Sequence, residues 1–370
     1  MRFVSAAAAS LKIFPSSKAA RLRCLVLGMA FLGAVGAAGL AYAQEGQNRN
    51  GQNSVSSSAR QDRDSSSGEI HLLHIRGNIS MLVGAGGNIT VQAGDEGILL
   101  VDTGLAAMSD KVLEAIRPLS KKPLSYIINT DEVGDHTGGN ENIGKTGRPV
   151  PPSNGGNTGR EFMLKSAYII AFQTVLDRMS APIGKAAATP EGAWPNDTYS
   201  VSQKNLSFNG EAVQIFHQPA NTDGNSIVMF RSSDVISAGD IFDPTQYPII
   251  DLARGGSFQG VLEGLNRLKL MAVPANHQEG GTMIVPGHGR LCDAADLDVY
   301  QQMMIIVRDR IQAMIKRGMT LEQVKAAKLT RDYDPIYGSN TGNWTTDMFV
   351  EAAYKSISGK PEVKESREIN

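Results

Sequence analysis

The sequence contains little cysteine and little histidine, and both shortages limit what the protein can be. Its 370 residues include 2 cysteines, Cys24 and Cys292, and 6 histidines. Cys24 lies in a segment that we expect to be cleaved off, so no internal disulfide is expected. Stability must therefore come from a buried core. With 41% hydrophobic and 20% charged residues, the composition is that of an ordinary soluble globular protein.

Acidic side chains are absent from the first 43 residues. This segment carries five basic residues, then an apolar run from Cys24 to Leu40, then the small-residue sequence Ala-Tyr-Ala ending at Ala43. The order is typical of a secretory signal peptide cleaved after Ala43. We therefore expect an exported protein, periplasmic or secreted, that begins at Gln44. An uncleaved membrane anchor is the alternative, because the run approaches the ~20 residues of a spanning helix.

Cleavage would also change the balance of charge. Loss of five basic and no acidic residues takes the formal net charge from −1 to −6. A mildly acidic export product is a poor candidate for binding nucleic acid, and no stable membrane insertion is expected once the signal peptide is gone. The expected partner is a small-molecule substrate, and the sequence leaves the oligomeric state open.

Two common kinds of catalytic motif are missing as well. The glycine-rich turns lack the Lys-Ser/Thr pair of a phosphate-binding loop. Neither Cys292 nor any serine lies in a recognisable nucleophile elbow or Cys-His arrangement. Covalent catalysis of these kinds and nucleotide binding through a phosphate-binding loop are therefore not expected.

The rest of the chain divides by composition. Residues 44–68 are rich in Ser, Asn, Gln and Arg with almost nothing to bury, which predicts a disordered linker. Residues 69–292 alternate β-rich and helical patterns, and residues 293–370 are mainly helical in pattern. A signal peptide at 1–43 completes the predicted organisation.

Local patterns predict individual elements within these segments. Short β-rich runs separated by Gly-rich turns predict hairpins between about 70 and 101. We expect helices at 160–178 and 258–271, and a surface loop over 182–199. In the tail, one apolar stripe at helical spacing consists of Val299, Met303, Val307, Ile311 and Met314, and Thr-Leu-Glu-Gln at 320–323 reads as a capping box.

Five short motifs contain the candidate metal-binding and catalytic residues. They are VDTG with Asp102, NTDEVGDHTGGN at 129–140, PANTDGNSIV with Asn221, SAGDIF with Asp240, and VPGHG with His288. In order and spacing these motifs resemble the metal-site motifs of the metallo-β-lactamase superfamily over residues 70–292. The resemblance implies an α/β (α+β) fold, a four-layer αββα sandwich, here with a helical C-terminal extension. In that family, loops at one edge of the sandwich hold two zinc ions or related metals.

The resemblance implies one complete ligand set and one degraded set. The complete set consists of Asp135, His136, Asp240 and His288. The degraded set has lost its three histidines, and its positions hold Asp131, Val133 and Asn221. Zinc takes three or four N, O or S ligands, so the complete set predicts one divalent metal ion, most simply zinc. An Asp and an Asn without imidazole make a harder and weaker oxygen site.

Simpler explanations exist for each of these residues. Asp135 and His136 are also explained as caps of the turn that follows them, since Asp is a preferred N-cap. Asp131 is either a leftover loop residue or a general base beside the metal. Asn221 fits an ordinary turn, and Asp102 fits a structural role in accepting backbone N–H groups.

Two functional interpretations remain open. The first is an exported hydrolase that uses one metal ion on an ester, thioester, lactone or amide. The second is a non-catalytic member of the same fold that serves as a binding or structural protein. A β-lactamase is a third and weaker interpretation, because membership of a fold does not determine the substrate.

Overall fold

The computed structural model describes residues 68–149, 166–181, 189–277 and 280–359. The predicted signal peptide and all but the last residue of the predicted linker lie outside these ranges. Within them, no helix has the length and apolar character needed to cross a membrane.

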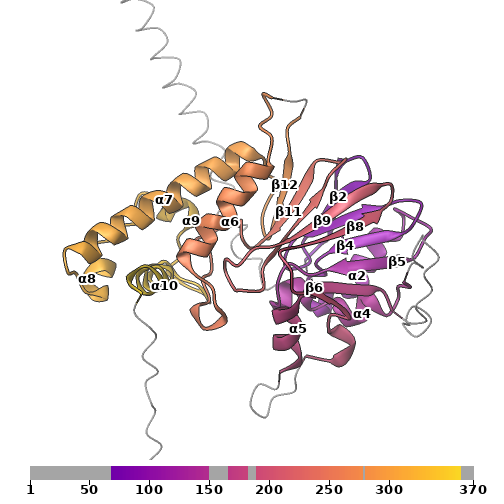
Figure 1. Cartoon of the computed structure of the whole chain (residues 1–370), viewed down its shortest axis with the longest axis horizontal. Helices are drawn as coiled ribbons and strands as arrows, with labels where there is room; N and C mark the ends of the chain where they lie inside the picture. The colour runs from indigo at the N-terminus through magenta and orange to yellow at the C-terminus, as the bar shows by residue number, and fades with distance from the viewer. Residues whose placement is uncertain (1–67, 150–165, 182–188, 278–279, 360–370) are drawn as a thin grey trace, which may run out of the picture. The chain divides into compact units, whose positions relative to one another are not determined.

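Two β-sheets form the centre of the described chain (Figure 1). The first sheet has strands in sequential order: β1 (His71–Arg76), β2 (Ile79–Val83), β3 (Ile89–Ala93), β4 (Ile98–Val101), β5 (Leu124–Ile128), β6 (Tyr168–Phe172) and β7 (Asp197–Tyr199). The second sheet has the order β12 (Met283–Pro286), β11 (Val235–Gly239), β10 (Ser226–Phe230), β9 (Glu211–His217) and β8 (Gln203–Phe208). Strands β1 to β4 pair antiparallel, as the hairpin pattern predicts.

Helices follow or connect these strands. The α-helices are α2 (Ser109–Ile116), α3 (Gly134–Thr137), α4 (Asn140–Gly144), α5 (Gln173–Ser180), α6 (Phe258–Met271), α7 (Ala294–Lys316), α8 (Leu321–Ala326), α9 (Asp334–Tyr337) and α10 (Thr346–Ser358). Short 3-10 helices are η2 (Ala106–Met108), η3 (Glu191–Ala193) and η4 (Leu252–Arg254). The predicted helix at 258–271 and the predicted capping box of Thr320 and Gln323 are confirmed.

The fold is the expected four-layer sandwich. Alternate residues of the central strand β4 point to opposite faces of the sheet: Leu99 and Val101 pack between the two sheets, whereas Ile98 and Leu100 pack against helix α2. Strand β10 does the same in the second sheet, where Ile227 faces the layer of helices α6 and α7. Both faces of each sheet are thus covered, so the strands read as nearly continuous apolar runs.

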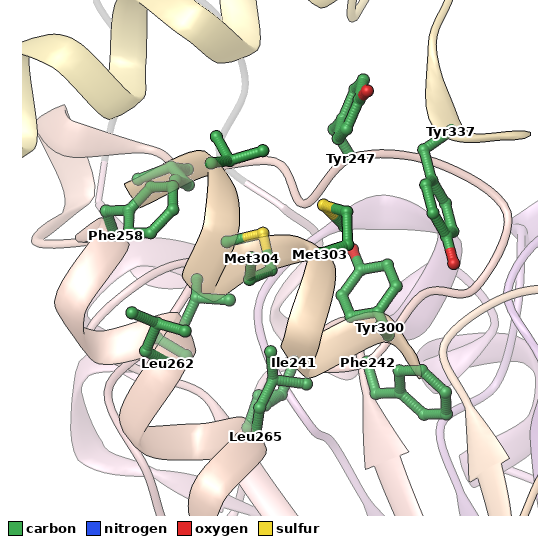
Figure 2. Close-up of a cluster of buried hydrophobic side chains, with 14 of the residues drawn as sticks. Ile241, Phe242, Tyr247, Phe258, Leu262, Leu265, Tyr300, Met303, Met304 and Tyr337 are labelled. Carbon is green, nitrogen blue, oxygen red and sulfur yellow. The ribbon is translucent and has the colours of Figure 1, made fainter. Parts of the chain in front are cut away.

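The C-terminal helices share the core of the second sheet. Buried side chains from α6 and α7 meet in one cluster (Figure 2), and Phe349, Val350 and Ala353 of α10 belong to the same cluster. Within it, the rings of Tyr247 and Phe349 stack with their centroids 4.5 Å apart, and Tyr300 packs edge-on against Tyr337. The hydroxyl of Tyr247 donates to Asp334. These aromatic contacts fix the chain around residues 337–346 against the loop that follows β11.

Three local predictions were wrong. Residues 160–165 of the expected helix at 160–178 lie outside the described residues. Within the described part, Tyr168–Phe172 form strand β6, because Ile169 and Ile170 are buried between layers and pair in parallel with β5, and the helix is α5, Gln173–Ser180. The expected loop over 182–199 contains strand β7. Val299 of the expected apolar stripe is 62% exposed, and the buried face of α7 instead includes Leu297 and Tyr300.

The topology places four of the five motifs at the carboxyl ends of parallel neighbouring strands. Strands β4 and β5 are parallel neighbours, as are β11 and β12. The carboxyl ends of parallel neighbours meet at the same edge of a sheet. Asp102 follows β4, the 129–140 turn follows β5, Asp240 follows β11 and His288 follows β12.

Candidate metal centre

The 129–140 turn is closed by its own two ends. The side chains of Asn129 and Asn140 exchange hydrogen bonds, with the Asn140 amide donating over 2.8 Å and the Asn129 amide over 3.1 Å. The Thr103 hydroxyl donates to the same Asn140 side chain. Gly138 permits a close approach, because a Cβ there would lie 2.5 Å from the carbonyl oxygen of Gly134. The two ends of the turn are therefore buried and tied together by hydrogen bonds, whereas its middle at Val133 and Gly134 is exposed.

His136 is held by Asp102. Nδ1 of His136 lies 2.8 Å from Oδ2 of Asp102, while the backbone N–H and the hydroxyl of Thr130 both donate to the same carboxylate. Asp102 is buried and adopts a positive φ of 66°, a conformation that Asp tolerates better than most residues. The predicted structural role of Asp102 is thus only part of its function, since it also orients the imidazole. Its contact to Nδ1 leaves Nε2 facing the site.

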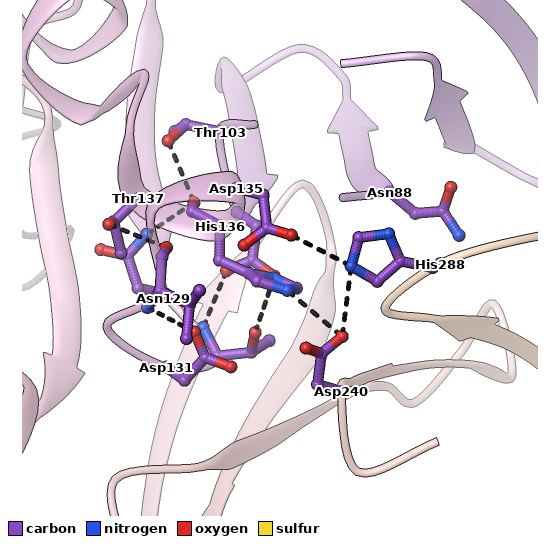
Figure 3. Close-up of polar contacts among 12 residues, drawn as sticks. Asn88, Thr103, Asn129, Asp131, Asp135, His136, Thr137, Asp240 and His288 are labelled. Carbon is purple, nitrogen blue, oxygen red and sulfur yellow. Dashed lines mark hydrogen bonds and ion pairs between the residues drawn. The ribbon is translucent and has the colours of Figure 1, made fainter. Parts of the chain in front are cut away.

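Four candidate ligand atoms converge (Figure 3). Nε2 of His136 lies 3.3 Å from Oδ1 of Asp240. Nε2 of His288 lies 3.5 Å from the same oxygen and 3.2 Å from Oδ2 of Asp135. Ligands about 2.0–2.2 Å from a tetrahedral zinc ion are separated from one another by roughly 3.3–3.6 Å. The three measured separations lie close to this range.

Unsatisfied atoms point to the same conclusion. Among the described residues, Oδ1 of Asp135, Nε2 of His136 and Oδ1 of Asp240 are buried and have no hydrogen-bond partner. Buried polar atoms are rarely left unpaired. Gly287 lets the two loops close in, since a Cβ there would lie 2.1 Å from Oδ1 of Asp240. The donor set and its geometry fit one divalent metal ion.

The electrostatics of the cluster favour a cation. Burial lowers the pKa of His136, but the nearby carboxylates of Asp131, Asp102 and Asp240 raise it well above its ordinary value. Burial likewise opposes ionisation of Asp135, yet its contact with His288 and the charges of the two histidines lower its pKa overall. A site that stabilises a proton on a buried imidazole so strongly would also stabilise a metal cation.

The alternative capping role of Asp135 and His136 is not what the structure shows. Helix α3 has Val133 as its N-cap and no side-chain cap. The loop that carries His288 is held by Asn88, which directly precedes β3: its side chain donates to the carbonyls of Pro286 and Gly289, and its backbone N–H donates to the carbonyl of Gly287. Asp135, His136, Asp240 and His288 are thus brought together by elements far apart in the sequence.

Asp131 lies against this cluster. Its Oδ1 accepts the backbone N–H of Val133 over 2.8 Å, and its Oδ2 lies 3.4 Å from the amide nitrogen of Asn225. Asp131, His136 and Asp240 each offer a ligand atom within 4.8 Å of the others. Burial raises the pKa of Asp131 to about 7. Each oxygen of the carboxyl group therefore has a contact within the protein, a short one on Oδ1 and a long one on Oδ2.

The two other positions of the degraded set face the same cavity. Val133 is 38% exposed and offers no ligand atom. The amide of Asn221 donates to the carbonyl of Ile249, which leaves its buried Oδ1 without a partner among the described residues. Asn221 is therefore more than an ordinary turn residue.

A cavity of about 880 Å³ opens in front of the cluster. One wall carries Asp131, Asp135, Asp240 and His288. Further lining residues come from the loop after β11 and from the C-terminal segment, and include Tyr247, Ile249, Arg254, Tyr337 and Trp344. The sequence motifs contain none of these five residues, and no local pattern linked the C-terminal tail to the site.

The remaining histidines lie elsewhere or have other partners. His71 and His74 are exposed on the edge strand β1. His217 contacts the carbonyl of Asp223 through Nε2 at 2.7 Å and stacks on Phe172. His217 is therefore a structural histidine with its ring and Nε2 both in contact with other residues.

Replacing Asp102 with Asn is expected to weaken metal binding by roughly 10- to 100-fold, the usual cost of losing an outer-shell partner. The Asn amide would place an N–H donor next to Nδ1 of His136, which favours the tautomer whose Nε2 carries the proton and cannot bind metal. The measurement is zinc affinity by chelator competition. Asp110→Asn, an exposed aspartate on α2, is the matched control, and equal affinities of the two variants would contradict the orienting role.

Comparisons with known proteins agree with this architecture. A family model described as the metallo-beta-lactamase superfamily matches residues 82–288. A linear primary-alkylsulfatase from Pseudomonas sp. (strain ATCC 19151) is 24% identical over 297 residues, which are 71% of this chain and 54% of that protein. The structure of a stereoselective inverting sec-alkylsulfatase from Pseudomonas sp. is similar with a TM-score of 0.58 and 13% identity, covering 81% of this chain and 52% of the other. The chain thus spans about half the length of these relatives.

Proposed function

Because the chain belongs to the metallo-β-lactamase superfamily, we propose that it is an exported hydrolase that works with one divalent metal ion, zinc, on an ester, thioester, lactone or amide. The observation that carries this proposal is the convergence of candidate ligand atoms: Nε2 of His136 and Nε2 of His288 lie 3.3 and 3.5 Å from Oδ1 of Asp240, and Nε2 of His288 lies 3.2 Å from Oδ2 of Asp135. A complete ligand set beside a cavity of 880 Å³ fits a small-molecule substrate, since such sites usually measure about 300–1,000 Å³.

The residues of the chain divide the work. Asp135, His136, Asp240 and His288 would hold the metal, which supplies polarisation of a carbonyl and a lowered pKa of water when bound. Asp131 would accept the proton of the attacking water at Oδ2, whose contact with the Asn225 amide is long at 3.4 Å, whereas Oδ1 accepts the N–H of Val133 over 2.8 Å. Oδ1 of Asn221 would accept a hydrogen bond from the water or the substrate. Hydrolysis of an ester then consumes one water and releases an acid and an alcohol.

A sulfate ester is the second candidate substrate. The alkylsulfatase match covers 71% of this chain, more than the family model does. Arg254 lines the cavity and is the kind of side chain that binds a sulfate group. Nε of Arg254 already lies 3.5 Å from Oδ2 of Asp251. Because Arg254 has this carboxylate partner, we place this candidate second.

Metal content is the decisive measurement for the proposed site. The purified mature protein is expected to retain about one equivalent of zinc after dialysis, because the degraded set offers no imidazole. Two tightly held equivalents would contradict the single-metal proposal. A screen of esters, thioesters, lactones, amides, sulfate esters and β-lactams then tests catalysis. Metal binding without turnover on any of them would favour the non-catalytic interpretation.

A further inference from the structure

A second, smaller hollow adjoins the cavity. It measures about 360 Å³ and lies between the 249–253 loop and helix α10. Its apolar lining consists of Ile249, Ile250, Leu252, Ala253, Trp344, Met348 and Ala352. Ile249, Asp251 and Trp344 line both the hollow and the cavity. We call this hollow the Trp344 groove, and the shared residues make it continuous with the candidate site.

Exposed apolar side chains follow the path from cavity to groove. Val133 and Ile249 are each 38% exposed and line the cavity, and Met348 is 43% exposed and lines the groove. Single exposed apolar residues are common on protein surfaces, but a series along one concave path marks a binding surface. The path begins beside the metal ligands and ends on α10.

The charged residues of the groove are paired with one another or with close neighbours. Asp251 lies 3.5 Å from Arg254, and Glu351 lies 3.0 Å from Lys355. Lys325 also contacts Glu351. Since these charges are compensated within the protein, the groove suits an uncharged, apolar occupant. Met348 adds a flexible thioether that adapts to irregular apolar shapes.

We propose that the Trp344 groove holds the unbranched hydrocarbon chain of an amphiphilic substrate whose scissile group lies at the metal centre. This proposal rests on the proposed hydrolase function, because it assigns a substrate class to the same site. Trp344 lies where the two hollows meet, and its buried Nε1 has no hydrogen-bond partner among the described residues. Its indole offers apolar ring surface to the hydrocarbon chain.

Tryptophan fluorescence offers a direct test, because the chain has 2 tryptophans. Trp194 does not line either hollow, so Trp194→Phe leaves Trp344 as the sole reporter. In this variant, titration with ethanol, 1-butanol, 1-hexanol and 1-octanol should give a saturable emission change. Affinity should rise roughly two- to fourfold per methylene group, as expected for burial of a hydrocarbon chain. The neutral alcohols need neither metal nor turnover.

Two further variants separate the groove from other apolar surface. Met348→Asp in the Trp194→Phe background places a charge in the groove. This variant should abolish the gain in affinity from butanol to octanol. Val299→Asp, at an apolar residue of α7 that is 62% exposed and lines neither hollow, should leave that gain intact. The Trp344→Phe variant, which retains Trp194, should give no saturable emission change.

The outcomes for groove and hydrolase differ. Equal responses to ethanol and octanol, or an octanol response that survives Met348→Asp, would overturn the groove. Octanol binding with the expected chain-length trend, but without hydrolysis of any ester, would leave the groove standing while the hydrolase proposal fails. Hydrolysis of acetate and decanoate esters with equal kcat/KM, together with no octanol binding, would contradict the groove proposal and leave the hydrolase proposal standing.

Discussion

Replacing Asp131 with Asn is expected to lower turnover by roughly two to four orders of magnitude, the usual scale of general acid–base catalysis. The change keeps the shape of the side chain, and its remaining oxygen can still accept the backbone N–H of Val133. What it removes is the basic oxygen that faces His136 and Asp240. The measurement is kcat on whichever ester proves to be a substrate, together with zinc content.

Zinc content separates the possible roles of Asp131. If Asp131 is a base, the Asn variant should still hold about one equivalent of zinc. Loss of the metal would instead indicate that Asp131 is a ligand. Unchanged kcat would indicate that Asp131 serves only to hold the turn through its contact with Val133. Asp95→Asn, at an exposed turn, controls for loss of a carboxylate as such and should leave kcat and zinc content near those of the parent.

Replacing His288 with Ala is expected to weaken zinc binding by more than about 100-fold, beyond the cost of losing an outer-shell partner. Nε2 of His288 lies within 3.5 Å of candidate ligand oxygens on both Asp135 and Asp240. Its removal leaves three ligands and opens the site to water. Zinc retained after dialysis, measured by elemental analysis, should fall from about one equivalent toward zero.

His217→Ala is the matched control for this experiment. His217 is half-buried, its Nε2 already contacts the carbonyl of Asp223 and its ring stacks on Phe172. The control should retain zinc, even if it loses some stability. Retention of zinc by the His288 variant, or equal loss from both variants, would contradict the proposed ligand set.

Much of the fold was predictable from the sequence because its signals are local. Alternating and continuous apolar runs identified most strands, and the 3.6-residue period identified the helix at 258–271. The failure at 160–178 has a physical cause. Short apolar runs such as Tyr168–Phe172 satisfy both periods, and only pairing with β5 and burial between layers make this one a strand. The prediction that Val299 belongs to the buried face was wrong because periodicity specifies the spacing of apolar residues, not which face of α7 the core will cover.

The candidate site divides in the same way. By itself the sequence determined which residue types are present: a single set of Asp and His side chains with metal-binding chemistry, and Asp131, Val133 and Asn221 at three positions where the family resemblance implies histidine. Only the tertiary structure decided that Asp102 orients His136, that Asp131 faces His136 and Asp240, and that Trp344 forms a wall of the same cavity. Ligand chemistry resides in individual side chains and can be read locally. A cavity wall depends on long-range packing, here the stacking of Phe349 on Tyr247 that brings the C-terminal segment to the loop after β11.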